Sequence, residues 1–92
     1  MGVTLGDRLI VPEDVVSRKL GEETVLLNLK TGVYFGLDPV GTRFLELLQD
    51  TGELSAVHGT MLQEYDVAPE RLEADLLRLS EECLAKGLLV RG

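Results

Sequence analysis

The sequence predicts an α+β fold in which a three-stranded antiparallel sheet is followed by three helices, like a winged helix-turn-helix with its sheet moved to the front. Short apolar runs separated by Gly-containing turns fill the N-terminal part, which is typical of hairpins. After Asp38-Pro39 the apolar residues recur at helical spacing instead. Helix-ending glycines and Pro69 then divide the remaining chain into three helical segments.

The strands are expected at Val15 to Leu20, Thr24 to Leu29 and Val33 to Leu37. Because the connections between them are short, they form a meander in which the third strand lies at an edge. The first helix follows directly, with Asp38 as its N-cap and Pro39 at its first position, and ends at Gly52. The second helix fits Leu54 to Tyr65, and the third runs from about Pro69 to Lys86 and stops at Gly87.

The 92 residues make one domain, 1–92, with an ordered core over about 8–90. Residues 1–7 are expected to be loosely held. Arg8 to Val11 could pair at a margin of the sheet before Pro12 interrupts them. Leu88 to Val90 form an apolar tail that is either strand-like or tucked under the sheet.

The net charge of −7 argues against nucleic acid and against an anionic membrane surface as partners. The N-terminus lacks a basic segment followed by a long apolar run, so no signal peptide is expected, and no run of apolar residues is long enough to span a membrane. Cys83 is the single cysteine and cannot form an internal disulfide, which favours a reducing compartment. We therefore expect a cytoplasmic protein.

Catalytic and cofactor motifs are weak. His58 is the single histidine, Cys83 falls among core positions, and no third group completes a catalytic or zinc-binding set. The glycines match neither the phosphate loop nor the dinucleotide fingerprint. No enzyme activity, cofactor or metal is expected.

The third helix predicts a core stripe and a wider apolar arc. At about 100° per residue, Leu72, Leu76, Leu79 and Cys83 share one band, while Leu77 and Leu84 lie to one side without an evident intramolecular partner. As a DNA-recognition helix this segment would present a net negative face, whereas major-groove readers are usually basic.

The most informative stretch is VYFGL, residues 33–37, because it holds two of the four aromatic residues and no charge. Neighbouring residues of a strand point to opposite faces, so Tyr34 and Phe35 diverge. We expect Phe35 to face the helices with Val33 and Leu37, leaving Tyr34 beside an unpaired edge. Such an edge lacks the usual protection against pairing. Either Tyr34 is an ordinary half-exposed residue, or the edge accepts an added peptide strand.

The segments EETVLLNLKTGVYFGLDPVGTRFLELLQDTG and LQEYDVAPERLEADLLRLSEECLAKGLL together resemble the PqqD-like family of recognition elements, over roughly Val15 to Leu89. These domains bind the leader of a ribosomally made precursor peptide. The resemblance implies that the leader adds as a strand to the third strand and lies against the third helix. The implied peptide-binding residues are Val33, Tyr34, Phe35, Gly36, Leu37, Arg71, Leu72, Asp75, Leu76 and Leu79.

Gln49 to Gly52 stand where the pyrroloquinoline-quinone branch typically has Cys-Asp-Gly, and Asp38-Pro39-Val40-Gly41 resembles the stand-alone proteins of lasso-peptide clusters. That branch implies a cysteine-protease-like leader peptidase and an ATP-dependent macrocyclase as further partners. Three alternatives stay open: a quinone-biosynthesis peptide chaperone that partners a radical enzyme, a winged-helix DNA-binding regulator, and a homodimer formed by edge pairing.

Overall fold

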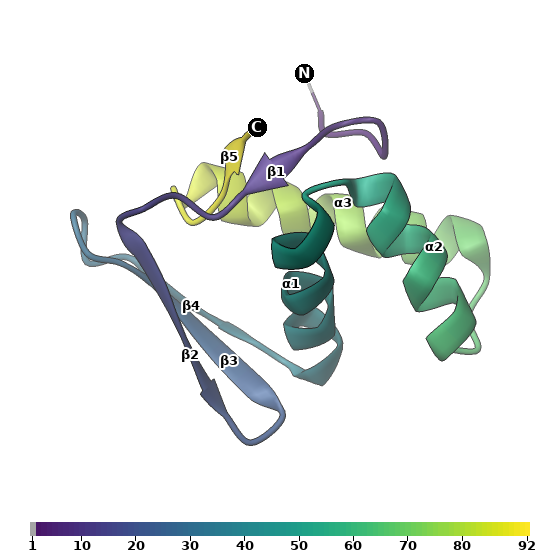
Figure 1. Ribbon diagram of the computed structural model, residues 1–92, viewed down its shortest axis with the longest axis horizontal. Coiled ribbons are helices and arrows are strands. Elements are labelled where there is room, and N and C mark those ends of the chain that lie inside the picture. The colour runs from purple at the N-terminus through teal and green to yellow at the C-terminus, as the bar shows by residue number, and fades with distance from the viewer. Residues whose placement is uncertain (1) are drawn as a thin grey trace.

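The computed structural model describes residues 2–92 and has the expected α+β architecture (Figure 1). Strands β2, β3 and β4 form one sheet, and three helices pack on one side of it. The elements are β1 Leu9–Ile10, β2 Val15–Leu20, β3 Glu23–Asn28, β4 Tyr34–Leu37, α1 Pro39–Thr51, α2 Leu54–Glu64, α3 Pro69–Ala85 and β5 Val90–Arg91. The predicted strands and helices are confirmed, and their ends differ from the prediction by one residue at most.

The main sheet is an antiparallel meander in the order β2-β3-β4. Val15 lies opposite Asn28 at one end of the β2–β3 pair, and Thr24 lies opposite Leu37 at one end of the β3–β4 pair. Within the described chain β4 pairs with β3 alone, so its other side is an open edge, as the short connections predict.

The start of α1 follows from local chemistry. The Asp38 carboxylate accepts a hydrogen bond from the Gly41 N–H at 2.7 Å, and Pro39 occupies the first turn, where no N–H is needed. The helix ends at Gly52, whose φ of 74° is left-handed and whose N–H donates to the Leu48 carbonyl. These two caps hold α1 directly after the edge strand.

Apolar residues from the inner face of the sheet and from all three helices form one core. The largest fully buried side chains include Leu26, Phe44, Leu48, Leu54, Met61, Leu76, Leu88 and Leu89. Leu and Val dominate this set because the chain has only four aromatic residues. In the C-terminal apolar tail, Leu88 and Leu89 are buried in this core, and strand β5 begins at Val90.

The N-terminal segment is held more firmly than expected. Met1 lies outside the described residues, but Val3 is only 5% exposed and joins the core. Its N–H donates to the Glu81 carboxylate of α3 at 3.2 Å, and Asp7 pairs with Arg91 at 3.1 Å. The expectation that residues 1–7 are loosely held is wrong for Val3 and its neighbours, because the end of α3 and strand β5 offer them partners.

Two further expectations need correction. Arg8 to Val11 do not extend the main sheet, since Leu9 and Ile10 pair with β5 in a separate two-stranded sheet. Leu77 and Leu84 are not left without partners either, because both are half-buried and pack against the core. Leu84 lines a shallow hollow together with Val3, so the N-terminal segment covers part of that flank of α3.

Candidate functional site

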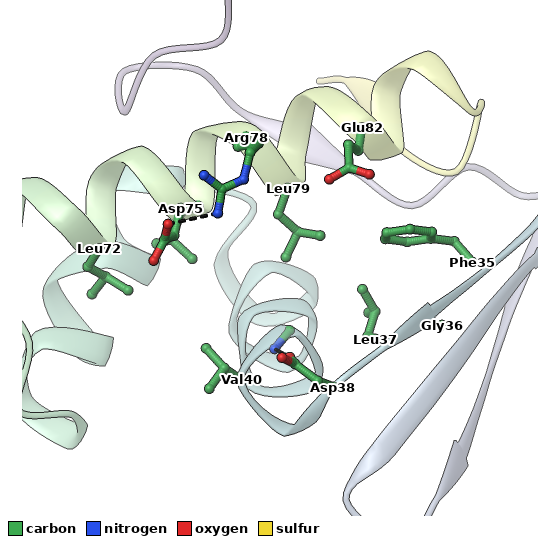
Figure 2. Close-up of a pocket in the computed structure, with 12 residues that line it drawn as sticks. Phe35, Gly36, Leu37, Asp38, Val40, Leu72, Asp75, Arg78, Leu79 and Glu82 are labelled. Carbon is green, nitrogen blue, oxygen red and sulfur yellow. Dashed lines mark hydrogen bonds and ion pairs between the residues drawn. The ribbon is translucent and has the colours of Figure 1, made fainter.

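A groove with a volume of about 430 Å³ lies between β4 and α3 and reaches the first turn of α1 (Figure 2). Side chains from β4 and α3 point toward each other across it, as Phe35, Leu37 and Leu79 show. The lining residues are Phe35, Gly36, Leu37, Asp38, Val40, Gly41, Leu72, Asp75, Leu76, Arg78, Leu79 and Glu82.

Seven of the ten residues that the sequence predicts for a peptide site line this groove. The other three, Val33, Tyr34 and Arg71, do not. Val33 precedes β4, Arg71 is exposed, and Tyr34 is 73% exposed on the opposite face of the sheet. The structure therefore brings the predicted strand and helix residues together, while their role in binding stays a prediction.

The residues of β4 divide between the two faces of the sheet. Leu37 is 4% exposed and Phe35 packs against the core, so both face the helices. Tyr34 and Gly36 belong to the other face because side chains alternate along a strand. The expectation that Phe35, rather than Tyr34, anchors the strand to its own helices is confirmed.

The backbone N–H and C=O groups of β4 point alternately toward β3 and toward the open edge. The Asn28 N–H donates to the Val33 carbonyl at 2.9 Å, and on the other side of β3 the Leu29 N–H donates to the Asp14 carbonyl at 2.8 Å. In an antiparallel pair, hydrogen-bonded and non-hydrogen-bonded residue pairs alternate. Since Val33 is hydrogen-bonded to β3, Phe35 and Leu37, two and four residues further along, are hydrogen-bonded to β3 as well. The N–H and C=O groups of Tyr34 and Gly36 consequently point to the open edge, where an added strand would find them.

The first turn of α1 closes one end of the groove. Val40 is 42% exposed and contributes an apolar surface there. Gly41 is buried, and a Cβ atom at this position would lie 3.2 Å from the Leu37 Cβ. The missing side chain of Gly41 therefore permits this close contact between the start of α1 and β4, and a Cβ would force Leu37 to shift.

Apart from Asp38 at the start of α1, the charged lining residues lie along the α3 side of the groove. Asp75 and Arg78 form an ion pair at 2.8 Å, one turn apart on the helix. Near the other end, the Lys86 Nζ lies 5.6 Å from the centroid of the Phe35 ring, within the range of a cation–π contact. The groove thus combines an apolar interior with charges of both signs at its margin.

Sequence reasoning missed five lining residues: Asp38, Val40, Gly41, Arg78 and Glu82. The first three form the helix start that the sequence did reveal, but nothing in the pattern placed that start against α3. Arg78 and Glu82 are polar residues of α3 outside its apolar stripe, and their spacing alone does not show which neighbour they meet.

The two reactive side chains of the chain are not assembled into a site. Cys83 is buried, which raises the pKa of its thiol to about 11 and keeps it protonated. The His58 ring nitrogen is 2.9 Å from the Pro69 carbonyl, at the far end of α3. Cys83 lies fourteen residues further along that helix, a rise of ~21 Å. Among residues 2–92, no three His, Cys, Asp or Glu side chains are grouped to hold a metal ion.

The open strand and the apolar groove beside it define a small binding domain that can accept an extended segment of another chain. Residues 23–89 match the family model described as Coenzyme PQQ synthesis protein D (PqqD). This match covers most of the chain, which therefore belongs to the PqqD family. A comparison with curated protein sequences gives no significant match.

Two solved structures share the fold. One is described as TbiB1 in complex with the TbiA(beta) leader peptide; it is 37% identical, with a TM-score of 0.81 over 86% of this chain and 92% of that one. The other is described as lasso peptide synthetase B1 complexed with the leader peptide. It is 19% identical, with a TM-score of 0.81 over 90% of this chain and 98% of that one. In the part of this chain that is described, no helix is both long and apolar enough to cross a bilayer.

Proposed function

We propose that this protein is a non-catalytic adaptor that binds the leader segment of a ribosomally made precursor peptide, of the lasso-peptide class. The leader adds as a strand to the open edge of β4 and fills the groove against α3. The observation that carries the proposal is the edge itself: Tyr34 and Gly36 turn their backbone groups outward, directly beside a groove lined by Phe35, Leu37 and Leu79. The relative of 37% identity, described in complex with a leader peptide, supports the same reading.

Backbone pairing with residues 33–37 sets the register of the leader, and the groove selects alternate side chains. Apolar leader residues would contact Leu72, Leu76 and Leu79, and Asp75 would meet leader charges at the margin. The exposed Arg71 lies outside the groove lining and would meet leader charges beyond it. An interface of this size fits micromolar to submicromolar affinity, about −8 to −9 kcal/mol.

The adaptor presents its leader to pathway enzymes: a cysteine-protease-like leader peptidase and an ATP-dependent macrocyclase. It works without a cofactor of its own and in the cytoplasm, which suits a chain with a single buried and free cysteine. Neither nucleic acid nor membrane is a partner, in keeping with the net charge of −7.

The family description favours one other function, that of a peptide chaperone in quinone biosynthesis. Such a protein would use the same groove but would bind a different precursor and partner a radical enzyme. The neighbouring precursor gene separates the two, since it encodes either a lasso-type peptide or a short peptide with Glu and Tyr. The described leader complex of 37% identity supports leader binding in either branch, and the resemblance of Asp38-Pro39-Val40-Gly41 to the stand-alone proteins favours the lasso branch.

The edge can be tested with two substitutions at one position. Gly36→Pro removes an N–H that points to the open edge, whereas Gly36→Ala keeps it, and no atom lies within 4 Å of the added Cβ. Calorimetric titration with the cognate leader should show at least tenfold weaker binding for Gly36→Pro and nearly unchanged binding for Gly36→Ala.

A matched control lies on β2, at the opposite edge of the sheet. Because odd-numbered residues of β3 bond to β2, the Ser17 N–H points outward from the opposite edge. Ser17→Pro should leave leader affinity unchanged. Equal losses in Gly36→Pro and Ser17→Pro, or amide shifts on titration that avoid 33–37 and α3, would contradict strand addition at β4.

A further inference from the structure

The face of the main sheet that points away from the helices is unusually apolar. Val16, Leu27 and Tyr34 lie opposite one another on the three strands and form a continuous row across this face. Val16 is 45% exposed and Tyr34 is 73% exposed. Leu20, which is 57% exposed, and Val25 extend the apolar surface along the strands. We call Val16, Leu20, Val25, Leu27 and Tyr34 the outer face.

Three features interrupt this outer face. Glu23 lies opposite Leu20 and places an exposed carboxylate at one end of it. Arg18 lies in its middle row, opposite Val25, and makes no ion pair within residues 2–92. Gly36 completes the same row and leaves space, because no atom lies within 4 Å of the position of its Cβ. A hollow of about 300 Å³ lies there, lined by Leu20, Val25 and Gly36 among others.

An added leader strand would enlarge this face. In an antiparallel pair, residues directly opposite each other project to the same side of the sheet. Leader residues opposite Phe35 and Leu37 would therefore enter the groove, while those opposite Tyr34 and Gly36 would project onto the outer face. The bound leader thus contributes side chains to the same surface as Tyr34, Leu27 and Val16.

The size of the outer face argues against a second copy of this chain as its occupant. Two strands of six residues and one of four, about 4.8 Å apart, cover at most roughly 14 by 20 Å, or about 300 Å². A stable interface buries about 800 Å² on each partner. Two copies, each with a net charge of −7, would also repel one another. The face suits a transient contact instead.

We propose that the outer face is the docking surface for the enzyme that processes the bound leader, an inference that rests on the proposed function. The partner presents an apolar patch to Val16, Leu27 and Tyr34 and a carboxylate to Arg18. The enzyme contacts this surface and, at the same time, the leader side chains that project onto it. The enzyme therefore docks on the adaptor only when a leader is bound. It is thus recruited to leaders that are already paired with β4 in the correct register.

The test uses the intact adaptor, the precursor peptide and the purified leader peptidase of the same biosynthetic cluster. The double variant Val16→Ser/Arg18→Glu alters the face on β2, the strand furthest from the groove. Its affinity for a labelled leader, measured by fluorescence anisotropy, should stay within twofold of the original. The cleavage rate should fall at least tenfold, to the rate without adaptor.

The matched control is Ile10→Ser/Lys19→Glu. Ile10 is exposed in the separate small sheet, and Lys19 is next to Arg18 but projects to the other face, where it pairs with Glu46. This control makes the same net charge change and should cleave at the original rate. Normal cleavage with Val16→Ser/Arg18→Glu would overturn the inference, as would light scattering that shows a dimer through this face. Absence of leader binding in the unsubstituted adaptor would instead refute the proposed function.

Discussion

The Asn28 side-chain amide donates a hydrogen bond to the Gly87 carbonyl at 2.9 Å and so ties the end of β3 to the end of α3. Its oxygen accepts from the Lys30 N–H at 2.9 Å and from the Thr31 N–H at 3.2 Å, which shapes the turn before β4. One mostly buried side chain thus fixes both walls of the groove relative to each other.

Asn28→Ala should lower the free energy of unfolding by about 1–3 kcal/mol, because it leaves buried polar groups without partners. Asn28→Asp keeps the acceptor for the turn but loses the donor to Gly87 while it is ionised. Relative to the original protein, this variant should recover part of its loss at acid pH, where the protonated carboxyl can donate. Urea unfolding at several pH values measures both effects, and an equal deficit at every pH would contradict the role of the donor.

The contact between Lys86 and Phe35 is a second link across the groove. A partly exposed cation–π pair of this kind contributes about 0.5–1 kcal/mol. We expect a double-mutant cycle with Phe35→Leu and Lys86→Gln to give a coupling energy in that range, measured by urea unfolding. Lys86→Arg keeps the cation and should retain most of the coupling. Purely additive effects would show that the ring and the ammonium do not interact.

Local signals were sufficient to predict the architecture. Asp38-Pro39 and Gly52 bound α1 through caps that involve neighbouring residues alone, and the change from strand to helical spacing separates the sheet from the helices. The pairing of Leu9 and Ile10 with β5 could not be predicted in the same way. It joins two-residue strands from the two ends of the chain, and neither has a periodic pattern of its own.

The candidate site was predicted less completely for a related reason. Alternation along β4 indicated that Phe35 and Tyr34 diverge, and helical spacing placed Leu72, Leu76 and Leu79 on one stripe. Which flank of that stripe meets the sheet depends on how α3 crosses it, and that geometry is tertiary. Leu77 was therefore treated as spare surface, and the groove residues Arg78 and Glu82 were missed.

Leu79 and Leu77 offer a paired test of the groove. Both are half-buried on α3, but Leu79 lines the groove and Leu77 does not. Either change to Ala should lower the free energy of unfolding by about 1–2 kcal/mol, less than for a fully buried leucine. Leu79→Ala alone should weaken leader binding about tenfold by calorimetry. Similar affinities for the two variants would place the leader elsewhere.

Cys83 should make the protein sensitive to alkali. Burial raises the pKa of its thiol from 9.0 to about 11, so between these values the unfolded chain loses a proton that the folded chain keeps. The contribution of this thiol to the free energy of unfolding is fully present below pH 9. It falls by about 2–3 kcal/mol as the pH rises through 11. Cys83→Ala should show a smaller decline between pH 7 and 10.5 in urea unfolding under reducing conditions. All other side chains are the same in both proteins, so the difference between the two curves isolates the thiol, and parallel curves would contradict the expected shift.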